Sequence, residues 1–243
     1  MMVKSLIWIT GASSGIGAAL AQTVPWKDAR IIGISRRPPV GIEHVEADLS
    51  DPSAWSKVGL SFAEELAHFE GDRVVFIQAA GDVESIGFAG EVDTDAYARS
   101  VVLNSAAPQV LGHMFLKAAR SVNAERHLMM MSSGAAQSVY PGWASYGASK
   151  AAMDQWVRDA GAEQDLRGGV KIVSIAPGTV DTGMQKTLRE TDARDFPNRQ
   201  KFVDLHAAGK LTPPEEAAEK MWGVLGQGLD NGSVVDLRKL ALV

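Results

Sequence analysis

Residues 6–17 read LIWITGASSGIG, an apolar run followed by a glycine-rich turn and the start of a helical pattern. This order predicts the first βα unit of a parallel sheet. We expect Gly11 to allow the tight turn, Gly15 to let backbone approach a pyrophosphate, and Gly17 to let the helix pack closely on the strand. The amide groups at the helix start would then face phosphate oxygens, and the helix dipole would favour this arrangement. The contacts expected from this turn are Gly11, Ser13, Ser14, Gly15, Ile16 and Gly17.

Short apolar runs alternate with helical stretches along the rest of the chain, which is typical of α/β proteins. The pattern predicts one Rossmann-type domain over residues 1–243, with a doubly wound parallel sheet of about seven strands flanked by helices. The predicted strands are 4–10, 29–35, 44–47, 73–78, 127–132, 171–176 and 232–237. The charged stretch from residue 183 to about 212 interrupts this alternation, and we expect it to form a small helical lid over the substrate.

Composition narrows the class of protein. The chain has 243 residues, of which 46% are hydrophobic and 22% charged, values typical of a globular protein. The net charge of −5 argues against a nucleic-acid surface. The absence of cysteine rules out disulfides and thiolate metal sites and favours a reducing, cytoplasmic setting. The apolar run at residues 6–9 is too short for a signal-peptide core or a membrane span.

A second stretch, MMMSSGAAQSVYPGWASYGASKAAM at residues 129–153, carries a candidate acid–base site. Tyr146 and Lys150 are four residues apart, so on a helix they lie one turn apart on the same face. An ammonium beside a phenol favours the phenolate, and we therefore expect the pKa of Tyr146 to be lowered. Ser133, at the end of the preceding strand, is placed to hydrogen-bond the same substrate oxygen. Such a site exchanges a proton with that oxygen near neutral pH and needs a hydride source, which a dinucleotide in the first turn would provide.

The end of the second predicted strand bears on the choice of dinucleotide. An acidic residue there bonds the adenosine 2′-hydroxyl of NAD, whereas arginine accommodates a 2′-phosphate. Ser35 stands at the acidic position, and Arg36 and Arg37 follow it. The sequence therefore predicts NADP(H). The alternative is a solvated basic pair with no role in binding.

The motif TGxxxGxG at residues 10–17, Ser133, and YxxxK beginning thirteen residues later at Tyr146 resemble together the short-chain dehydrogenase/reductase family. The resemblance runs over essentially the whole chain. Within that family, GWASYGASKAA (142–152) and APGTVDTGMQ (176–185) are similar to the sepiapterin reductase and benzil reductase branch. The resemblance implies an NADPH-dependent carbonyl reductase acting on a small-molecule ketone, such as a vicinal diketone or a pterin side-chain ketone, with no metal ion.

The resemblance also implies further cofactor contacts. Asp48, with Leu49 beside it, would meet the adenine ring, although an acid in a turn is the simpler interpretation. The small residues after the fourth strand would let the cofactor approach the backbone, and a later loop would hold the nicotinamide carboxamide. The family usually carries Asn-Asn-Ala-Gly where this chain has Gln-Ala-Ala-Gly, so whether Gln78 replaces the usual side-chain bracing stays open. The residues of these two segments are Ala79, Ala80, Gly81, Pro177, Gly178, Val180 and Thr182.

The implied catalytic set has four members. Ser133 would position the carbonyl oxygen, Tyr146 would protonate it, and Lys150 would lower the tyrosine pKa and bind the nicotinamide ribose. Asn104 lies in a long helical stretch over 94–121, which we expect to break near this residue and to kink at Pro108. In the family an asparagine here binds, through its backbone, a water linked to the lysine; a polar residue relieving a helix break is an equally plausible role on sequence alone.

Three residues are candidate substrate contacts: Trp143, Met184 and Asp236. Trp143 precedes the tyrosine, but a large aromatic is more often packing. Asp236 in VVDL resembles the aspartate with which sepiapterin reductases hold the pterin ring, and diketone reductases also carry an acid there. The family implies subunit pairing through the helices of Asn104 and Tyr146, as a homodimer or homotetramer. The competing functions are an NAD-linked alcohol dehydrogenase on the same fold and a non-catalytic dinucleotide-binding sensor.

Overall fold

Seven parallel strands form one sheet in the computed structural model, which describes residues 4–240. Their order across the sheet is β3-β2-β1-β4-β5-β6-β7, so the chain runs outward from β1 in one direction and from β4 in the other. The predicted doubly wound parallel sheet is confirmed. The strands are β1 Ser5–Thr10, β2 Ala29–Ser35, β3 Glu43–Glu46, β4 Arg73–Gln78, β5 Glu125–Met131, β6 Lys171–Ala176 and β7 Ser233–Asp236.

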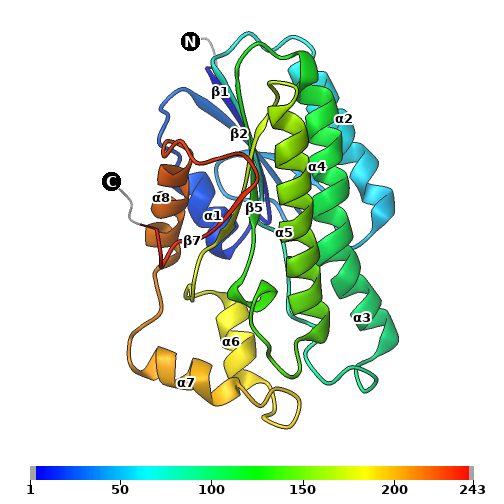
Figure 1. Cartoon of the computed structure of the whole chain (residues 1–243), viewed down its shortest axis with the longest axis vertical. Coiled ribbons are helices and arrows are strands. Elements are labelled where there is room, and N and C mark those ends of the chain that lie inside the picture. The colour runs from blue at the N-terminus through cyan, green and yellow to red at the C-terminus, as the bar shows by residue number, and fades with distance from the viewer. Residues whose placement is uncertain (1–3, 241–243) are drawn as a thin grey trace.

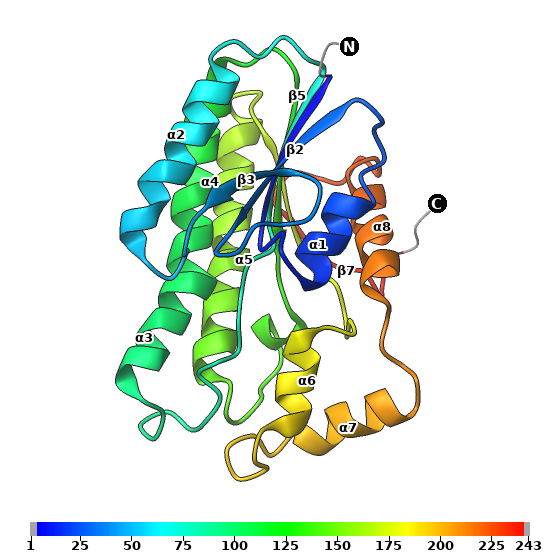
Figure 2. The same cartoon turned by 180° about the vertical axis from the view of Figure 1, so that it is seen from behind.

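Helices cover both faces of this sheet (Figure 1, Figure 2). One layer contains α2, α4 and α5, with α3 extending beyond it, and the other contains α1 and α8. Two further helices, α6 and α7, lie past the carboxyl ends of the strands. The helices are α1 Gly15–Gln22, α2 Trp55–Leu66, α3 Thr94–Val101, α4 Ala107–Ala118, α5 Ala144–Asp165, α6 Gly183–Glu190, α7 Arg199–Ala207 and α8 Pro214–Val224. No helix within residues 4–240 is long and apolar enough to cross a membrane.

Strand β1 supplies both cores because successive side chains point to opposite faces. Leu6 and Trp8 pack into the core under α2, α4 and α5, whereas Ile7 and Ile9 pack into the core under α1 and α8. All four are fully or almost fully buried, which explains why β1 reads as a continuous apolar run. The first of these cores is centred on four aromatic rings with centroids 4.9–6.3 Å apart: Trp8, Phe62, Phe76 and Phe115.

The point where the strand order reverses, between β1 and β4, is braced by one threonine. The Thr10 hydroxyl donates to Gln78 Oε1 at 2.8 Å and accepts the backbone amides of Ala79 and Ala80, both at 2.9 Å. Gln78 therefore contributes to bracing at the switch point through Thr10. Ligands of such sheets bind in the crevice at this point.

The helical stretch predicted over residues 94–121 is interrupted near Asn104, as the sequence predicts, but the interruption is a π-helical turn rather than a proline kink. Val102–Ala106, between α3 and α4, forms a π-helical turn that contains Asn104, and Pro108 follows in the first turn of α4. Single π-turns within α-helices occur frequently at functional sites. The strand ends also differ slightly from prediction, most visibly in β5, which starts at Glu125 and ends at Met131.

The segment carrying α6 and α7 begins and ends at neighbouring points. Val180 and Thr212 pair in an isolated parallel bridge, in which Thr212 N donates to Thr179 O and Asp181 N donates to Thr212 O. The two helices therefore form an excursion beyond the strands whose two ends are held together by this bridge (Figure 1). That they act as a lid stays a prediction.

We expect Phe62→Ala to lower the free energy of unfolding by about 3–5 kcal/mol, because it removes a fully buried ring from the aromatic cluster and leaves a cavity. Leu60 on the same helix is 58% exposed, so Leu60→Ala should change the same quantity by at most about 0.5 kcal/mol. Urea titration followed by circular dichroism measures both values. Equal losses in the two variants would contradict the assignment of the core.

Candidate active site

One cavity of about 1160 Å³ opens at the carboxyl ends of β1, β4, β5 and β6. Every residue predicted to touch the cofactor lines it, and so do Ser133, Trp143 and Met184. Asn104 and Asp236 do not line it. The structure also brings side chains to the cavity wall that the sequence reasoning missed: Asp82, Arg99, Tyr140, Gln185, Lys201 and Arg238.

The turn between β1 and α1 has the form of a phosphate cradle. Gly11 and Gly15 adopt positive φ values of +68° and +54°, which non-glycine residues rarely adopt. A Cβ atom on Gly17 would lie 2.4 Å from Gly11 O, so only glycine fits there. Ser14 makes no capping hydrogen bond to the start of α1. The first amides of the helix are therefore available to a phosphate, and the turn fits a dinucleotide.

The far end of the cavity carries two free cations. Arg36 and Arg37 are exposed, and within residues 4–240 neither forms a salt bridge or a side-chain hydrogen bond. The Ser35 hydroxyl donates to Arg37 O at 2.6 Å, which fixes the start of this loop. Asp48 Oδ1 accepts both the amide and the hydroxyl of Ser50, so this carboxylate shapes a turn at the cavity wall. An adenine contact by Asp48 stays a prediction.

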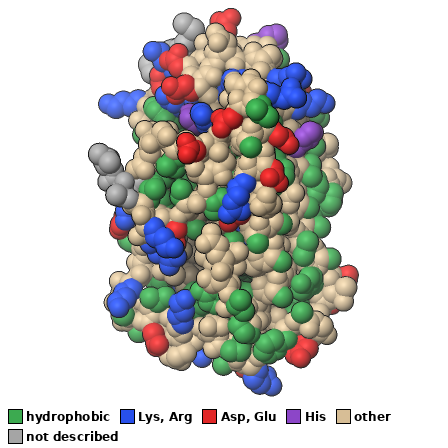
Figure 3. Space-filling view, in the orientation of Figure 1, with side chains coloured by type: hydrophobic (Ala, Val, Ile, Leu, Met, Phe, Trp, Pro, Cys, Tyr) green, Lys and Arg blue, Asp and Glu red, His purple; other side chains and the backbone are tan. Residues whose placement is uncertain are grey.

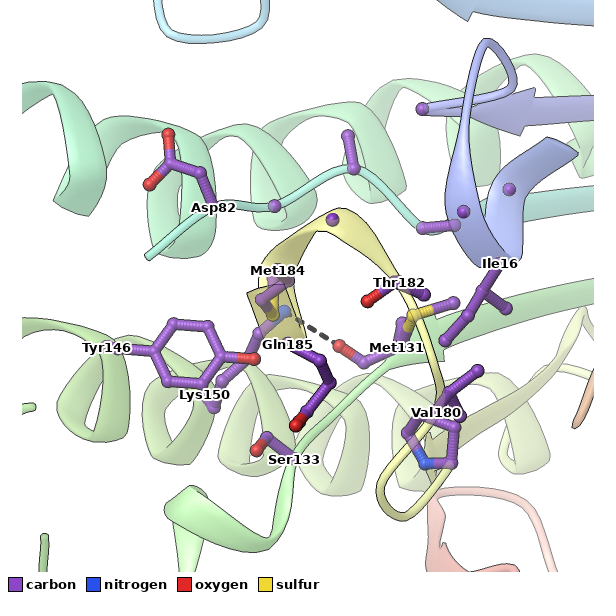
Figure 4. A pocket seen from close by; sticks show the side chains of 18 of the residues that line it. Ile16, Asp82, Met131, Ser133, Tyr146, Lys150, Val180, Thr182, Met184 and Gln185 are labelled. Atoms are coloured by element: carbon purple, nitrogen blue, oxygen red, sulfur yellow. Dashed lines mark hydrogen bonds between the residues drawn. The ribbon is translucent and has the colours of Figure 1, made fainter. Parts of the chain in front are cut away.

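Ser133, Tyr146 and Lys150 converge at the middle of the cavity (Figure 4). Tyr146 and Lys150 project from the same face of α5, and their residues are only 7% and 4% exposed. The Lys150 ammonium donates to Met131 O at 2.8 Å and lies 5.7 Å from the centroid of the Tyr146 ring. Helix α5 thus presents a phenol and an ammonium to the end of β5, as the spacing predicts.

A buried carboxylate fixes α5 against the sheet. Asp154 lies one turn beyond Lys150, is 2% exposed, and accepts hydrogen bonds from Ser132 Oγ at 2.9 Å and Ser174 Oγ at 2.6 Å. Ser132 therefore anchors the helix, whereas Ser133 faces the cavity. The signal for Asp154 was present in the sequence, since residues 146, 150 and 154 recur at four-residue steps on one helix face.

The expected lowering of the tyrosine pKa is wrong for the ligand-free protein. Burial raises the pKa of Tyr146 to about 12; the Ser133 hydrogen bond opposes the rise and the Asp82 charge adds to it. Burial lowers the pKa of Lys150 to about 8, against the opposing effect of Asp154 and Asp82. Desolvation outweighs the attraction between neighbours because both groups lie out of water. The phenol is therefore protonated at neutral pH.

Asn104 acts through the loop that follows β4. Its Oδ1 accepts the Asp82 amide at 3.1 Å, and its Nδ2 donates to Asp82 O and to Ser100 Oγ, each at 3.1 Å. A Cβ atom on Gly81 would lie 2.8 Å from Asn104 Oδ1 and 3.7 Å from Lys150 Nζ. The fully buried amide thus holds this loop close to the ammonium. A water relay through the backbone of Asn104 stays a prediction.

The predicted carboxamide loop reaches the phosphate turn. Pro177, Gly178, Val180 and Thr182 line the cavity. A Cβ atom on Gly15 would lie 3.4 Å from Thr182 Cγ2, so the loop after β6 meets the start of α1. A cofactor spanning the cavity would therefore pass between these two segments.

The remaining end of the cavity is aromatic. Trp143 packs against Tyr140, Tyr146, Phe196 and Phe202, with centroids 4.9–5.7 Å apart. Four of these rings line the cavity together with Met184 and Leu188: Tyr140, Trp143, Tyr146 and Phe202. Such a wall suits a flat apolar substrate group.

Asp236 is turned toward a neighbour rather than toward the cavity. Its two oxygens accept Arg238 Nε at 2.9 Å and Arg238 Nη2 at 2.5 Å, which holds the pKa of this carboxyl below its usual value. The stem of Arg238 lies over Gly178, where an added Cβ atom would be 3.2 Å from Arg238 Cδ. At this point the cavity wall is Arg238, and direct contact between Asp236 and substrate stays a prediction.

The sequence model of the family described as short chain dehydrogenase matches residues 5–193. The chain belongs to the short-chain dehydrogenase family. It is 32% identical to a benzil reductase ((S)-benzoin forming) of Bacillus subtilis, covering 95% of this chain and 97% of that protein. It is 31% identical to sepiapterin reductase of Mus musculus, covering 94% of each chain. Its fold matches the crystal structure of the KRED1-Pglu enzyme with a TM-score of 0.81 and 25% identity, over 95% of this chain and all of the other.

Membership confirms the resemblance stated from the motifs, including its benzil and sepiapterin reductase branch. Short-chain dehydrogenases are oxidoreductases whose fold binds a nicotinamide dinucleotide. The cradle at Gly11, Gly15 and Gly17 fits that group, since side chains there would fill the space next to the turn. In the part of the chain that the structure describes, three or more His, Asp or Glu side chains nowhere gather as a metal site would require.

In this short-chain dehydrogenase we expect the ligand-free protein to gain stability as pH rises from about 8 toward 10. The pKa of Lys150 is about 8 when folded and 10.5 when exposed, so in this window the unfolded chain binds the proton that the folded chain has released. Lys150→Met should remove this rise, whereas Lys186→Met, at an exposed lysine, should keep it. Urea unfolding at several pH values measures it, and an unchanged rise in Lys150→Met would contradict the lowered pKa.

Proposed function

We propose that this protein is an NADPH-dependent carbonyl reductase that transfers hydride to a ketone, with vicinal diketones or pterin side-chain ketones as the favoured substrate classes. One observation carries the proposal. A single cavity joins the glycine turn and the two free arginines to the serine, tyrosine and lysine at its centre and to an aromatic wall beyond them. The space expected for the cofactor, the proton donor and the space expected for the substrate thus all belong to one cavity.

The acid–base step follows from the state of Tyr146. When bound, the nicotinamide supplies the hydride. Because the pKa of Tyr146 is raised to about 12, the phenol carries its proton at neutral pH and can give it to the carbonyl oxygen as negative charge develops there. The Ser133 oxygen accepts the Ala135 amide at 3.2 Å, so its own proton, which in the ligand-free protein is shared with Tyr146, can be donated to the carbonyl oxygen.

Lys150 stabilises the phenolate that Tyr146 becomes when it gives up its proton. Loss of the proton leaves a phenolate in a site shielded from water, where a nearby positive charge is far more effective than in bulk solvent. Lys150, with a pKa of about 8, is mostly protonated at neutral pH. The Met131 carbonyl and the charges of Asp82 and Asp154 favour this protonated form.

The aromatic wall supports an aryl or similarly flat substrate. Trp143 lies 5.2 Å from the ring of Tyr146, so a ring stacked on that wall would place an attached carbonyl beside the phenol. The relatives named benzil reductase and sepiapterin reductase act, by name, on compounds with flat rings. Arg238, held by Asp236, would add a polar contact at the rim.

Two alternatives are less well supported. An NAD-linked alcohol dehydrogenase would be favoured by an acid at the end of β2, where this chain has Ser35 followed by two unpaired arginines. A non-catalytic dinucleotide sensor would not need Tyr146 and Lys150, which are both present and buried in the cavity.

Assembly and location remain proposals as well. We expect a homodimer or homotetramer formed through the α4 and α5 side of the molecule, where Figure 3 shows hydrophobic side chains at the surface. Val101, next to the π-turn, is 37% exposed and belongs to this side. A cytoplasmic location is consistent with a chain that has no cysteine.

The direct test is the consumption of NADPH by the purified protein with a panel of diketones, aldehydes and pterins. We expect oxidation of NADPH with at least one aryl diketone and much slower oxidation of NADH. A protein that consumes neither cofactor with any member of the panel is not a reductase of this class.

Tyr146→Phe should lower kcat at least about a hundredfold, since it removes the proton donor while keeping the ring that packs against Trp143. Circular dichroism and Tm should stay close to wild type. Tyr140→Phe, in the same aromatic wall, is the matched control and should keep most of the activity. Full turnover in Tyr146→Phe would refute the assignment of the proton donor.

Replacing both Arg36 and Arg37 by alanine should raise KM for NADPH about tenfold while leaving KM for NADH nearly unchanged, because only NADPH carries the 2′-phosphate that these cations would bind. Arg194→Ala removes an exposed arginine outside the cavity and is the control. Steady-state kinetics with both cofactors measures the effect. Equal changes for the two cofactors would show that the arginines do not read the phosphate.

A further inference from the structure

Basic side chains from two segments line the cavity at its aromatic end. They are Lys201 in α7, Lys210 just after that helix, and Arg238 just after β7. Within residues 4–240 neither of these two lysines forms a salt bridge. The acidic side chains that line the same cavity all follow β3 or β4: Asp48, Asp82 and Glu84. The wall formed by α7 and the C-terminal segment therefore has an excess of positive charge.

The Lys201 ammonium is held on the aromatic wall. It donates to the Tyr140 hydroxyl at 2.8 Å, and it lies 5.0 Å from the centroid of the Tyr140 ring and 5.8 Å from that of Phe202. Aromatic faces attract a cation at such distances. Because an ammonium has several donor hydrogens and the Tyr140 hydroxyl accepts only one, the others are available to a ligand.

Arg238 reaches from the C-terminal segment to the loop of the catalytic serine. A Cβ atom on Gly134, the residue after Ser133, would lie 3.7 Å from Arg238 Nη2. Asp236 accepts Nε and Nη2 and so fixes the guanidinium, whereas Nη1 has no hydrogen-bond partner within residues 4–240. Asp236 raises the pKa of Arg238 above its ordinary value and Tyr140 adds to this rise, so the Tyr140 hydroxyl is close to this cation too.

The cofactor does not account for these cations. Its phosphates are expected at the glycine turn and at Arg36 and Arg37, at the opposite end of the cavity. A flat substrate group is expected on Trp143, whose ring lies 5.2 Å from the rings of both Tyr146 and Tyr140. A substituent on that group would extend from the proton donor toward Tyr140 and the ammonium that it holds.

Resting on the proposed reductase activity, we propose that Lys201 and Arg238 form an anion subsite that selects aryl diketones with a carboxylate on the aromatic group. The reacting carbonyl lies at Ser133 and Tyr146, the ring lies on Trp143, and the carboxylate accepts hydrogen bonds from the ammonium and from the free nitrogen of the guanidinium. Hydrogen bonds between ionised groups are about twice as strong as those between neutral groups. The reacting atoms are those of the proposed function, and the subsite adds one recognised group.

The test compares three kinds of substrate with the purified protein and NADPH: benzil, benzil with a carboxylate at the meta or para position of one ring, and the methyl esters of these two acids. The ester withdraws electrons more strongly than the carboxylate, so without a subsite the ester is the more reactive ketone. We expect kcat/KM for at least one carboxylate to exceed that for its ester at least about tenfold. This ratio should fall as salt is added, because salt screens exposed charges.

Lys201→Met removes the charge and keeps a stem of similar length on the aromatic rings. It should lower kcat/KM about tenfold for the preferred carboxylate, with much smaller changes for the ester and for benzil and with KM for NADPH unchanged. Lys201→Arg keeps a cation and should retain most of the preference. Arg238→Met should reduce the preference further, because it also leaves the Asp236 carboxylate without its partner. Lys186→Met, at an exposed lysine of α6 outside the cavity, is the matched control and should keep wild-type values.

Three results would overturn the inference. The first is an unchanged ratio of carboxylate to ester in Lys201→Met. The second is a raised KM for NADPH in Lys201→Met with every substrate, which would assign the cation to the cofactor. The third is a lower Tm of Lys201→Met with equal losses on all substrates, which would make Lys201 a structural residue.

The inference and the proposed function fail in different ways. If wild type reduces benzil but does not prefer either carboxylate to its ester, the anion subsite is wrong and the reductase assignment stands. If wild type reduces no carbonyl of any kind, both are wrong.

Discussion

The arrangement of the site depends on the buried carboxylate of Asp154. It binds one serine at the end of β5 and another within β6, and so fixes the rotation and height of α5 against the sheet. Hydrogen bonds to a charged acceptor are stronger than those between neutral groups, and this one is shielded from water. Lys150 and Tyr146, which lie one and two turns earlier on the same face, are carried to the cavity as a consequence.

Burial then determines the chemistry. The same packing that excludes water from α5 raises the pKa of Tyr146 and lowers that of Lys150. The pair therefore consists of a neutral phenol and an ammonium that gives up its proton more readily than that of an exposed lysine. In carbonyl reduction this is a useful combination, because the tyrosine keeps its proton until negative charge forms on the substrate. The loop held by Asn104 adds Asp82 to the surroundings of both groups.

Local patterns were readable from the sequence, and contacts between distant segments were not. The glycine turn could be recognised because glycine alone has the backbone freedom that such a turn needs. Tyr146 and Lys150 could be placed together because residues four apart share one face of a helix. The fold and the centre of the site could therefore be predicted. The pKa of Tyr146 was predicted with the wrong sign, because spacing identifies a neighbouring charge but not the loss of water. Gln185 and Arg238 were missed, since their positions depend on how α6 and the C-terminal segment pack over the cavity.

The bridge between Val180 and Thr212 has a consequence for how such proteins diversify. Since α6 and α7 are inserted between two residues that are already paired, the intervening stretch can change in length and composition while the sheet keeps its register. Most of the residues expected to bind the cofactor and to transfer the proton lie outside that stretch, whereas Met184, Leu188 and Phe202, which are expected to face the substrate, lie inside it. The fold thus allows the segment with α6 and α7 to diverge among related proteins, and substrate preference with it, while the sheet and the residues at its strand ends are retained.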